Sequence, residues 1–229
     1  MALTDLWEDL TNKAMNKQTY YHLVLDRSGS MDSCWKEARQ SFQTQLQGFK
    51  DKQVEFTDQD LFFSYCAFNQ ALKFSEGILP ISQAAIDWRE IFPDGMTSLY
   101  DAIGSSIQFL KTKLRTELEN EHTDVVMLIL TDGFENSSRI FNGHEVKRLI
   151  NELELSGKWR FLFLGAGLNV EEATRELDRN GKNSFSFEKN SIQASMSFVS
   201  EEITDFMDLK SKGVKKDEFF KNKSGKNPL

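Results

Sequence analysis

The segment that most constrains the fold is the run DVVMLIL at residues 124–130, in which every position after the aspartate is apolar. A strand with one solvated face alternates apolar and polar residues, so this run predicts a strand covered on both faces. Strands of parallel sheets have this property because helices cover both sides of the sheet. Shorter apolar runs predict further strands at 20–25, 61–69, 71–74, 160–164 and 184–187.

Amphipathic segments of 10 to 20 residues alternate with these strands. Apolar residues recur at helical spacing in 3–16, 32–49, 99–114, 146–153, 170–177 and 191–209, and a short helix is expected near 81–86. Ser98 followed by Asp101 suggests a capping box at the start of one helix. The short link Asn69-Gln70 indicates a hairpin. The expected architecture is α/β: a three-layer α/β/α, Rossmann-like fold with a mostly parallel six-stranded sheet and one antiparallel edge strand.

Charge is unevenly distributed along the chain. The 229 residues carry a formal net charge of −7, but residues 210–229 contain seven lysines and two acidic residues, which leaves −12 for residues 1–209. We therefore expect three parts: an N-terminal helical extension at 1–18, one domain at 19–209 and a Lys-rich, disordered tail at 210–229 outside the fold.

Several functional classes are disfavoured by composition. An acidic body is poorly suited to nucleic acids, whose binding requires neutralisation of phosphates. The longest apolar run, 125–130, is too short to span a bilayer, so no membrane segment is expected. The first residues lack the order of a secretory signal. Two cysteines, Cys34 and Cys66, do not make a disulfide framework. We therefore expect a cytoplasmic protein with two reduced thiols.

Three separated segments should meet at the carboxyl edge of the sheet, where open α/β folds bind ligands. Asp26, Ser28 and Ser30 follow the first strand, Thr97 lies in the loop before the helix at 99–114, and Asp132 follows the central strand. Their donors are all oxygens, a set that suits Mg²⁺, with Mn²⁺ or Ca²⁺ as alternatives. Asp and Ser after a strand are also common in turns and helix caps, so the prediction rests on the presence of all three segments together.

In these residues the sequence resembles the von Willebrand factor type A family. The segments are DRSGSM at 26–31, GMTSLYDA at 95–102 and LILTDGFENSS at 128–138. Together with FLFLGAG at 161–167 they look like small intracellular bacterial or phage members. The resemblance implies that Asp26, Ser28, Ser30, Thr97 and Asp132 form a metal-ion-dependent adhesion site. It also implies a protein partner whose Glu or Asp completes the metal, and no catalysis.

Two other functions remain open. Haloacid-dehalogenase-type phosphatases also place an Asp after the first strand, but they need Asp-x-Asp for nucleophile and general acid, and Ser28 occupies the second place. The chain could also be a structural subunit of a larger assembly, because intracellular members of the resembled family often accompany AAA+ ATPases. Nucleotide binding is disfavoured because neither phosphate-binding glycine motif occurs.

Other residues near these motifs have more than one interpretation. Asp94 and Asp101 lie close to Thr97 in the sequence and could support the metal ligands, although Asp101 is better explained as a helix cap. Arg27 could meet an acidic partner or be a solvated loop residue. The sequence Gly165-Ala166-Gly167 predicts a tight turn, and the three histidines are expected on the surface or in packing positions.

Overall fold

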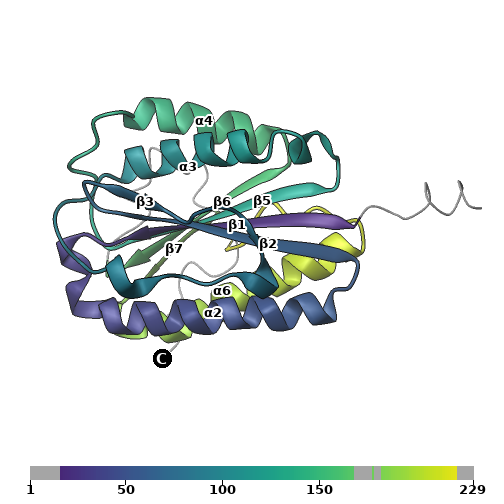
Figure 1. The fold of residues 1–229 in the computed structure, drawn as a ribbon, viewed down its shortest axis with the longest axis horizontal. Helices are drawn as coiled ribbons and strands as arrows, with labels where there is room; N and C mark the ends of the chain where they lie inside the picture. Colours follow the sequence, from purple (N-terminus) through teal and green to yellow (C-terminus); the bar gives the residue numbers. More distant parts are fainter. Residues whose placement is uncertain (1–15, 168–176, 178–181, 221–229) are drawn as a thin grey trace, which may run out of the picture.

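A single sheet forms the centre of the molecule in the computed structural model, which describes residues 16–167, 177 and 182–220. Six strands follow one another in the order β3-β2-β1-β5-β6-β7 (Figure 1). Their bounds are β1 Lys17–Asp26, β2 Gln59–Phe68, β3 Leu72–Phe74, β5 Thr123–Thr131, β6 Trp159–Ala166 and β7 Ser184–Phe187. β5 pairs in parallel with both β1 and β6, and all its residues from 125 to 131 are buried. The predicted central strand is confirmed.

Helices cover both faces of this sheet, as the doubly buried strands require. Figure 1 shows α3 (Leu99–Lys113) and α4 (Gly143–Leu155) on one face. The opposite face is covered by α2 (Trp35–Glu55) and α6 (Ile192–Ser211). Alternate residues of β1 therefore enter two cores: Tyr21 packs with the α2 and α6 side, and Val24 with the α3 and α4 side. The expected three-layer α/β/α architecture is confirmed.

The antiparallel edge of the sheet is more elaborate than expected. β3 pairs antiparallel with β2, as the hairpin prediction required. A two-residue strand, β4 (Leu79–Pro80), also pairs antiparallel with β2 and makes the sheet seven-stranded. Proline has no backbone N–H to donate, which restricts it to such edge positions. The helix expected at 81–86 is only a 3-10 turn, η2 (Ile81–Gln83), followed by a second, η3 (Trp88–Glu90).

The described part of the chain begins just before the first strand. β1 begins at Lys17, two residues before the expected domain boundary at 19. The expected N-terminal helix at 3–16 lies almost wholly outside the described residues, as does the one at 170–177. Within the described ranges, no helix is both long and apolar enough to cross a bilayer.

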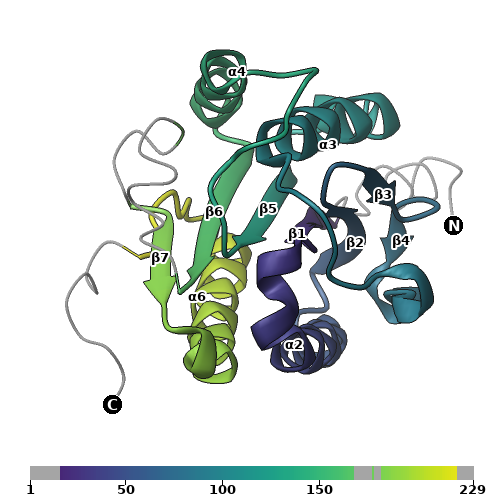
Figure 2. The same ribbon diagram turned by 90° about the vertical axis from the view of Figure 1, so that its left-hand side faces the viewer.

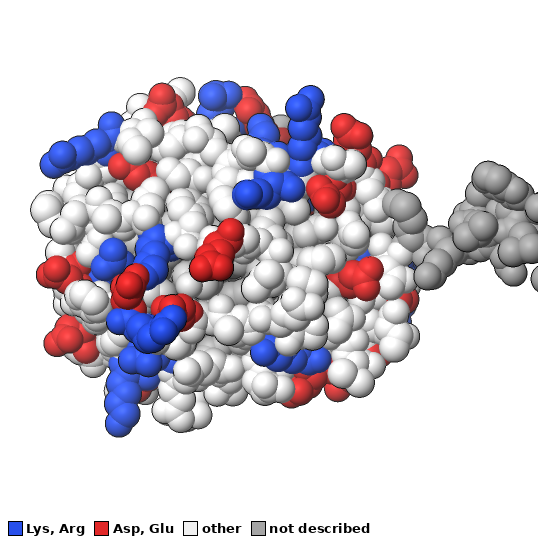
Figure 3. Space-filling view, viewed as in Figure 1, with Lys and Arg blue, Asp and Glu red and all other residues white. Residues whose placement is uncertain are grey.

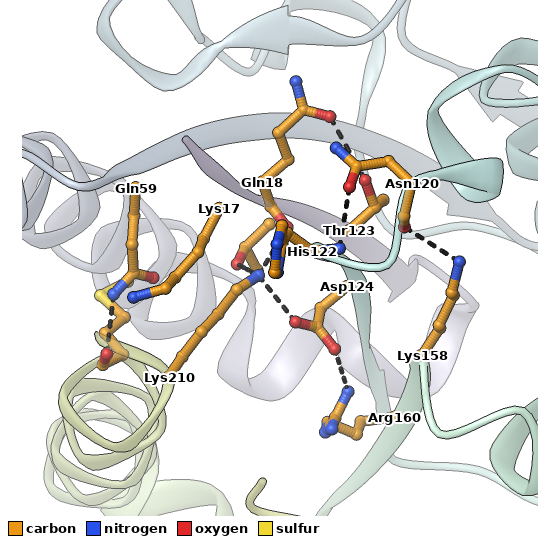
Figure 4. Close-up of polar contacts among 12 residues, drawn as sticks. Lys17, Gln18, Gln59, Asn120, His122, Thr123, Asp124, Lys158, Arg160 and Lys210 are labelled. Atoms are coloured by element: carbon orange, nitrogen blue, oxygen red, sulfur yellow. Dashed lines mark hydrogen bonds and ion pairs between the residues drawn. The ribbon is translucent and has the colours of Figure 1, made fainter. Parts of the chain in front are cut away.

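Residues 210–220 belong to the fold, so the expectation of a tail outside it was wrong for this segment. Lys210 is 8% exposed, and its ammonium lies 2.7 Å from Asp124, which also pairs with Arg160 at 2.6 Å (Figure 4). Burial lowers the pKa of Lys210 to about 8. Phe219 and Phe220 are buried against the α2 and α6 side. Apolar burial and ion pairing outweigh the lysine-rich composition here; residues 221–229 lie outside the described ones.

Figure 3 shows basic and acidic side chains interspersed on a face that is mostly uncharged. Both free cysteines, Cys34 and Cys66, are buried. Burial raises the pKa of these thiols, to about 11 for Cys34 and about 12 for Cys66. They are therefore protonated core residues at neutral pH.

Candidate metal centre

The parallel pairing of β1 with β5 brings the ends of both strands to one edge of the sheet, at the end of the molecule that faces the viewer in Figure 2. Asp26, the last residue of β1, is fully buried there. Its Oδ1 accepts a hydrogen bond from the Ser28 amide at 2.7 Å, and its Oδ2 accepts one from Thr131 Oγ1 at 2.6 Å. Burial nevertheless raises the pKa of Asp26 to about 6, with nearby Asp132 as a smaller contribution.

Three of the predicted ligands form a continuous chain of hydrogen bonds. The hydroxyls of Ser28 and Ser30 lie 3.1 Å apart, and Ser30 Oγ donates to Asp132 Oδ1 at 2.6 Å. Ser28 is buried, whereas Ser30 is exposed. The loop after β1 thus meets the loop after β5, and this group of oxygens is open to solvent on the side of Ser30.

Thr97 reaches the same place from a third loop, and the absence of a side chain at Gly133 makes room for it. A Cβ at residue 133 would lie 3.2 Å from Thr97 Oγ1 and 3.5 Å from Ser30 Oγ. Both hydroxyls therefore border one point beside Asp132. The Thr97 backbone is fixed by Asn136, whose Oδ1 accepts from the Thr97 amide at 2.9 Å and whose own amide donates to the Thr97 carbonyl at 3.0 Å.

Two buried or half-buried carboxylates hold the loop that follows Asp132. Glu135 accepts from the amides of Ser137 and Ser138, at 2.8 and 2.7 Å, and from the Tyr100 amide at 2.9 Å. Asp101 accepts from three successive backbone amides, Arg139, Ile140 and Phe141, each at 2.8 Å. The expected capping box is wrong, because no side chain caps this helix at Ser98 and the Asp101 carboxylate binds the loop instead.

One residue at the site was not anticipated from the sequence. Lys189 lies in the 3-10 turn η5 (Lys189–Ser191) that precedes α6, and its ammonium forms an ion pair with Asp132 Oδ2. The same ammonium donates to the Ser30 carbonyl at 2.8 Å and to Ser33 Oγ at 3.3 Å. No sequence motif identifies this lysine, because it reaches Asp132 only when β7 pairs with β6.

Residues considered alongside the ligands have mainly structural contacts. The Asp94 amide donates to the Arg27 carbonyl at 2.9 Å. This backbone hydrogen bond joins the loop after β1 to the loop that contains Thr97. Gly165 and Ala166 belong to β6, so the tight turn predicted at 165–167 does not include them; Gly167, which follows the strand, has a φ of 68°. His22 is fully buried with its Nδ1 2.8 Å from Ser64 Oγ, and the other histidines are exposed, so none lies in the group of oxygens.

The donor set suits a hard divalent cation. It consists of two carboxylates and three hydroxyls, and such cations prefer oxygen ligands. Among the described residues, no three His, Cys, Asp or Glu side chains are grouped so that they could hold a metal. A metal here would therefore depend on the hydroxyls of Ser28, Ser30 and Thr97, which lie near Asp26 and Asp132.

No protein-family model matches the sequence, and neither does any curated protein. Solved structures do share its fold. The von Willebrand factor domain of the pilus tip protein Mfa5 from Porphyromonas gingivalis is 10% identical with a TM-score of 0.59, covering 90% of this chain and 99% of that one. A von Willebrand factor type A protein from Catenulispora acidiphila is 13% identical, with a TM-score of 0.52 and coverages of 82% and 42%.

A third similar structure is proximal thread matrix protein 1 from the mussel byssus, described with a zinc-occupied metal-ion-dependent adhesion site. It is 17% identical with a TM-score of 0.51, covering 82% of this chain and 46% of that one. The chain thus spans less than half the length of the mussel and Catenulispora structures. These similarities establish that the chain has the fold of von Willebrand factor type A domains.

Proposed function

We propose that this chain is a divalent-metal-dependent protein-interaction module. Asp26, Ser28, Ser30, Thr97 and Asp132 would hold the metal, and an acidic residue of a partner protein would complete its coordination. The observation that carries the proposal is the convergence of these five side chains from three loops, with Gly133 leaving space beside Thr97 and Ser30. The zinc-occupied site of the mussel protein supports metal binding by this fold.

The chemistry of the site favours a carboxylate as the partner group. Three of the five ligands are neutral hydroxyls, so a bound divalent ion keeps much of its positive field. An acidic side chain that approaches from solvent is attracted to that field. Ser30 lies on the exposed side of the site and marks where such a group could enter.

The surroundings favour a protein over a small anion as the ligand. Met96, adjacent to Thr97, is 51% exposed, and Phe134, two residues after Asp132, is 53% exposed. Large apolar side chains that are half exposed beside a polar centre are typical of protein-binding surfaces. We infer that apolar residues flank the acidic residue of the partner.

We expect Mg²⁺ as the physiological ion, with Mn²⁺ or Ca²⁺ as alternatives, because the ligands are hard oxygens. We also propose a cytoplasmic location, which the two free buried cysteines support. An AAA+ ATPase assembly is the partner class that the resemblance to intracellular members suggests.

A peptide selection tests partner binding. Immobilised protein would be presented with a random phage-displayed peptide library in Mg²⁺, and bound phage would be eluted with EDTA. The proposal predicts peptides that carry Asp or Glu between apolar residues, that lose binding when the acid is changed to its amide, and that do not bind Asp132→Ala protein. Peptides that bind equally in EDTA, or equally as amides, would contradict it.

The phosphatase alternative has its own assay. Hydrolysis of p-nitrophenyl phosphate in Mg²⁺, abolished by Asp26→Asn, would favour phosphoryl transfer. Our proposal predicts no turnover above the buffer control in either protein.

A further inference from the structure

Both oxygens of the Asp132 carboxylate already have partners within the chain. Oδ1 accepts from Ser30 Oγ, and Oδ2 forms the ion pair with the Lys189 ammonium. The Asp132 side chain has no exposed surface, while the Lys189 side chain keeps 31% of its own. A divalent ion that uses Asp132 must therefore share this carboxylate with an ammonium that is already in place.

The position of Lys189 is fixed by the fold. β7 pairs in parallel with β6, with Ala166 opposite Phe187, and the Gly167 amide donates to the Phe187 carbonyl at 2.6 Å. Lys189 follows two residues later, and its turn η5 lies against η1 (Gly29–Cys34), the 3-10 segment after β1. The lysine thus approaches the metal loop from a strand pair that ends at the same edge of the sheet.

Gly167 provides the path for the lysine side chain. A Cβ at residue 167 would lie 2.9 Å from Lys189 Cγ and 3.3 Å from its Cε. Gly167 also has a φ of 68°, a conformation that other residues adopt at a cost. Two features of the sequence, a glycine after β6 and a lysine after β7, therefore combine to deliver one ammonium to the candidate metal centre.

The Lys189 ammonium and a divalent ion would repel each other, and both would bind the Asp132 carboxylate. Their repulsion is stronger where the charges are shielded from solvent, as they are beside the buried Asp132 carboxylate. In the absence of metal the ammonium neutralises Asp132, which lies close to Asp26 in a largely buried site. It thereby stabilises the metal-free loops and weakens the attraction of the site for a cation.

We propose that Lys189 is an internal counter-cation that competes with the divalent metal for Asp132 and sets the metal affinity of the site below what its five oxygen ligands would give. This inference rests on the proposed function and deepens it, because it assigns control of metal loading to a residue that is not itself a ligand. Lys189 is thus a positioning residue for Asp132.

Titration calorimetry with Mg²⁺ alone tests the proposal on the full chain. We expect Lys189→Met to bind Mg²⁺ about tenfold more tightly than wild type, with Lys189→Gln as a second variant that keeps a polar side chain. The control is Lys212→Met, which also removes one positive charge. Lys212 is exposed at the C-terminal end of α6, where it pairs with Asp208. The control should bind Mg²⁺ as wild type does.

Melting temperature gives a second readout that a merely structural lysine would not affect in this way. Without metal, both Lys189 variants should melt below wild type, because Asp132 loses its ion pair. With saturating Mg²⁺ the difference should vanish or reverse.

Equal Mg²⁺ affinity of wild type and both Lys189 variants would overturn the competition and leave the proposed function intact. Weaker binding by the variants would also overturn it. Absence of Mg²⁺ binding in wild type and variants alike would overturn the proposed metal function itself.

Discussion

Ser30 Oγ donates a 2.6 Å hydrogen bond to Asp132 Oδ1 across 102 residues of sequence. The bond joins the loop after β1 to the loop after β5, two strands that are neighbours in the sheet. It shows that the protein brings these loops together by its own fold. A metal bound at the proposed centre would therefore meet side chains that are already grouped.

Filling the space beside Thr97 should impair metal binding without unfolding the protein. In Gly133→Ala the new methyl group would lie 3.2 Å from Thr97 Oγ1. We expect a loss of Mg²⁺ affinity on the order of tenfold, as for other changes that misplace ligands, measured by titration calorimetry. Gly77→Ala is the control, because a Cβ there meets nothing within 4 Å. Equal affinities in the two variants would contradict the assigned position of Thr97.

The Asp101 carboxylate should stabilise the loop between β5 and α4. Asp101→Asn replaces one acceptor oxygen by a donor facing backbone amides, so we expect a loss of about 1.5–3 kcal/mol in the free energy of unfolding. Urea denaturation would measure it. Asp51→Asn, on the exposed face of α2 where Asp51 accepts from Gln47, should change stability by less than about 0.5 kcal/mol. If both variants had the same stability, the loop contacts would be energetically unimportant.

The C-terminal segment should contribute to stability and not to metal binding. Phe219 is 3% exposed and its ring lies 5.7 Å from that of Phe206. Phe219→Ala should cost about 3 kcal/mol or more in unfolding free energy while leaving Mg²⁺ affinity unchanged. Val214→Ala is the control in the same segment, because Val214 is 51% exposed. A Phe219→Ala protein as stable as this control would mean that residues 212–220 do not pack as described.

Buried His22 should make the protein less stable in mild acid. Burial lowers the pKa of His22 to about 3, against 6.5 for the unfolded chain. Below pH 6.5 His22 binds a proton in the unfolded state but stays neutral in the folded state. Stability from this residue is therefore complete above pH 6.5 and falls by about 1.4 kcal/mol per pH unit as the pH drops toward 3.

A double variant isolates this effect from other titrating groups. His22→Phe with Ser64→Ala keeps a ring beside Phe74 and Phe109 and removes the hydroxyl that His22 contacts. Its unfolding free energy should decline less steeply between pH 6.5 and 4.5 than that of wild type. His144→Gln, at an exposed position, should retain the wild-type decline. The same slope in the double variant and wild type would refute a buried neutral His22.

Apolar runs in the sequence were sufficient to predict the central strands because β1, β2, β5 and β6 are largely buried. The central run at 124–130 carries that signal most strongly, and the helices between the strands indicated that most of the sheet is parallel. β4 was missed because two residues ending in a proline have no period to detect. Its pairing depends on the neighbouring β2 alone.

The residues of the candidate site were predictable where they follow a predicted strand or belong to a family motif, and not where neither signal marks them. Asp26, Ser28 and Ser30 share one loop, whereas Lys189 reaches Asp132 only because β6 and β7 pair. Asp101 was misassigned because a carboxylate near a helix start can cap the helix or bind another loop, and only tertiary structure distinguishes them. The prediction for 210–220 was wrong because it relied on the lysine-rich composition, whereas Phe219 and Phe220 are buried.

The measurement that tests the central claim most directly is calorimetric titration of Mg²⁺, and of Mn²⁺, into the metal-free protein and into Asp26→Ala and Asp132→Ala. Each variant should first be shown by circular dichroism to be folded. We predict one saturable site in wild type and no detectable binding in either folded variant. Binding of equal affinity in wild type and both variants, or none in wild type, would contradict the proposed metal centre.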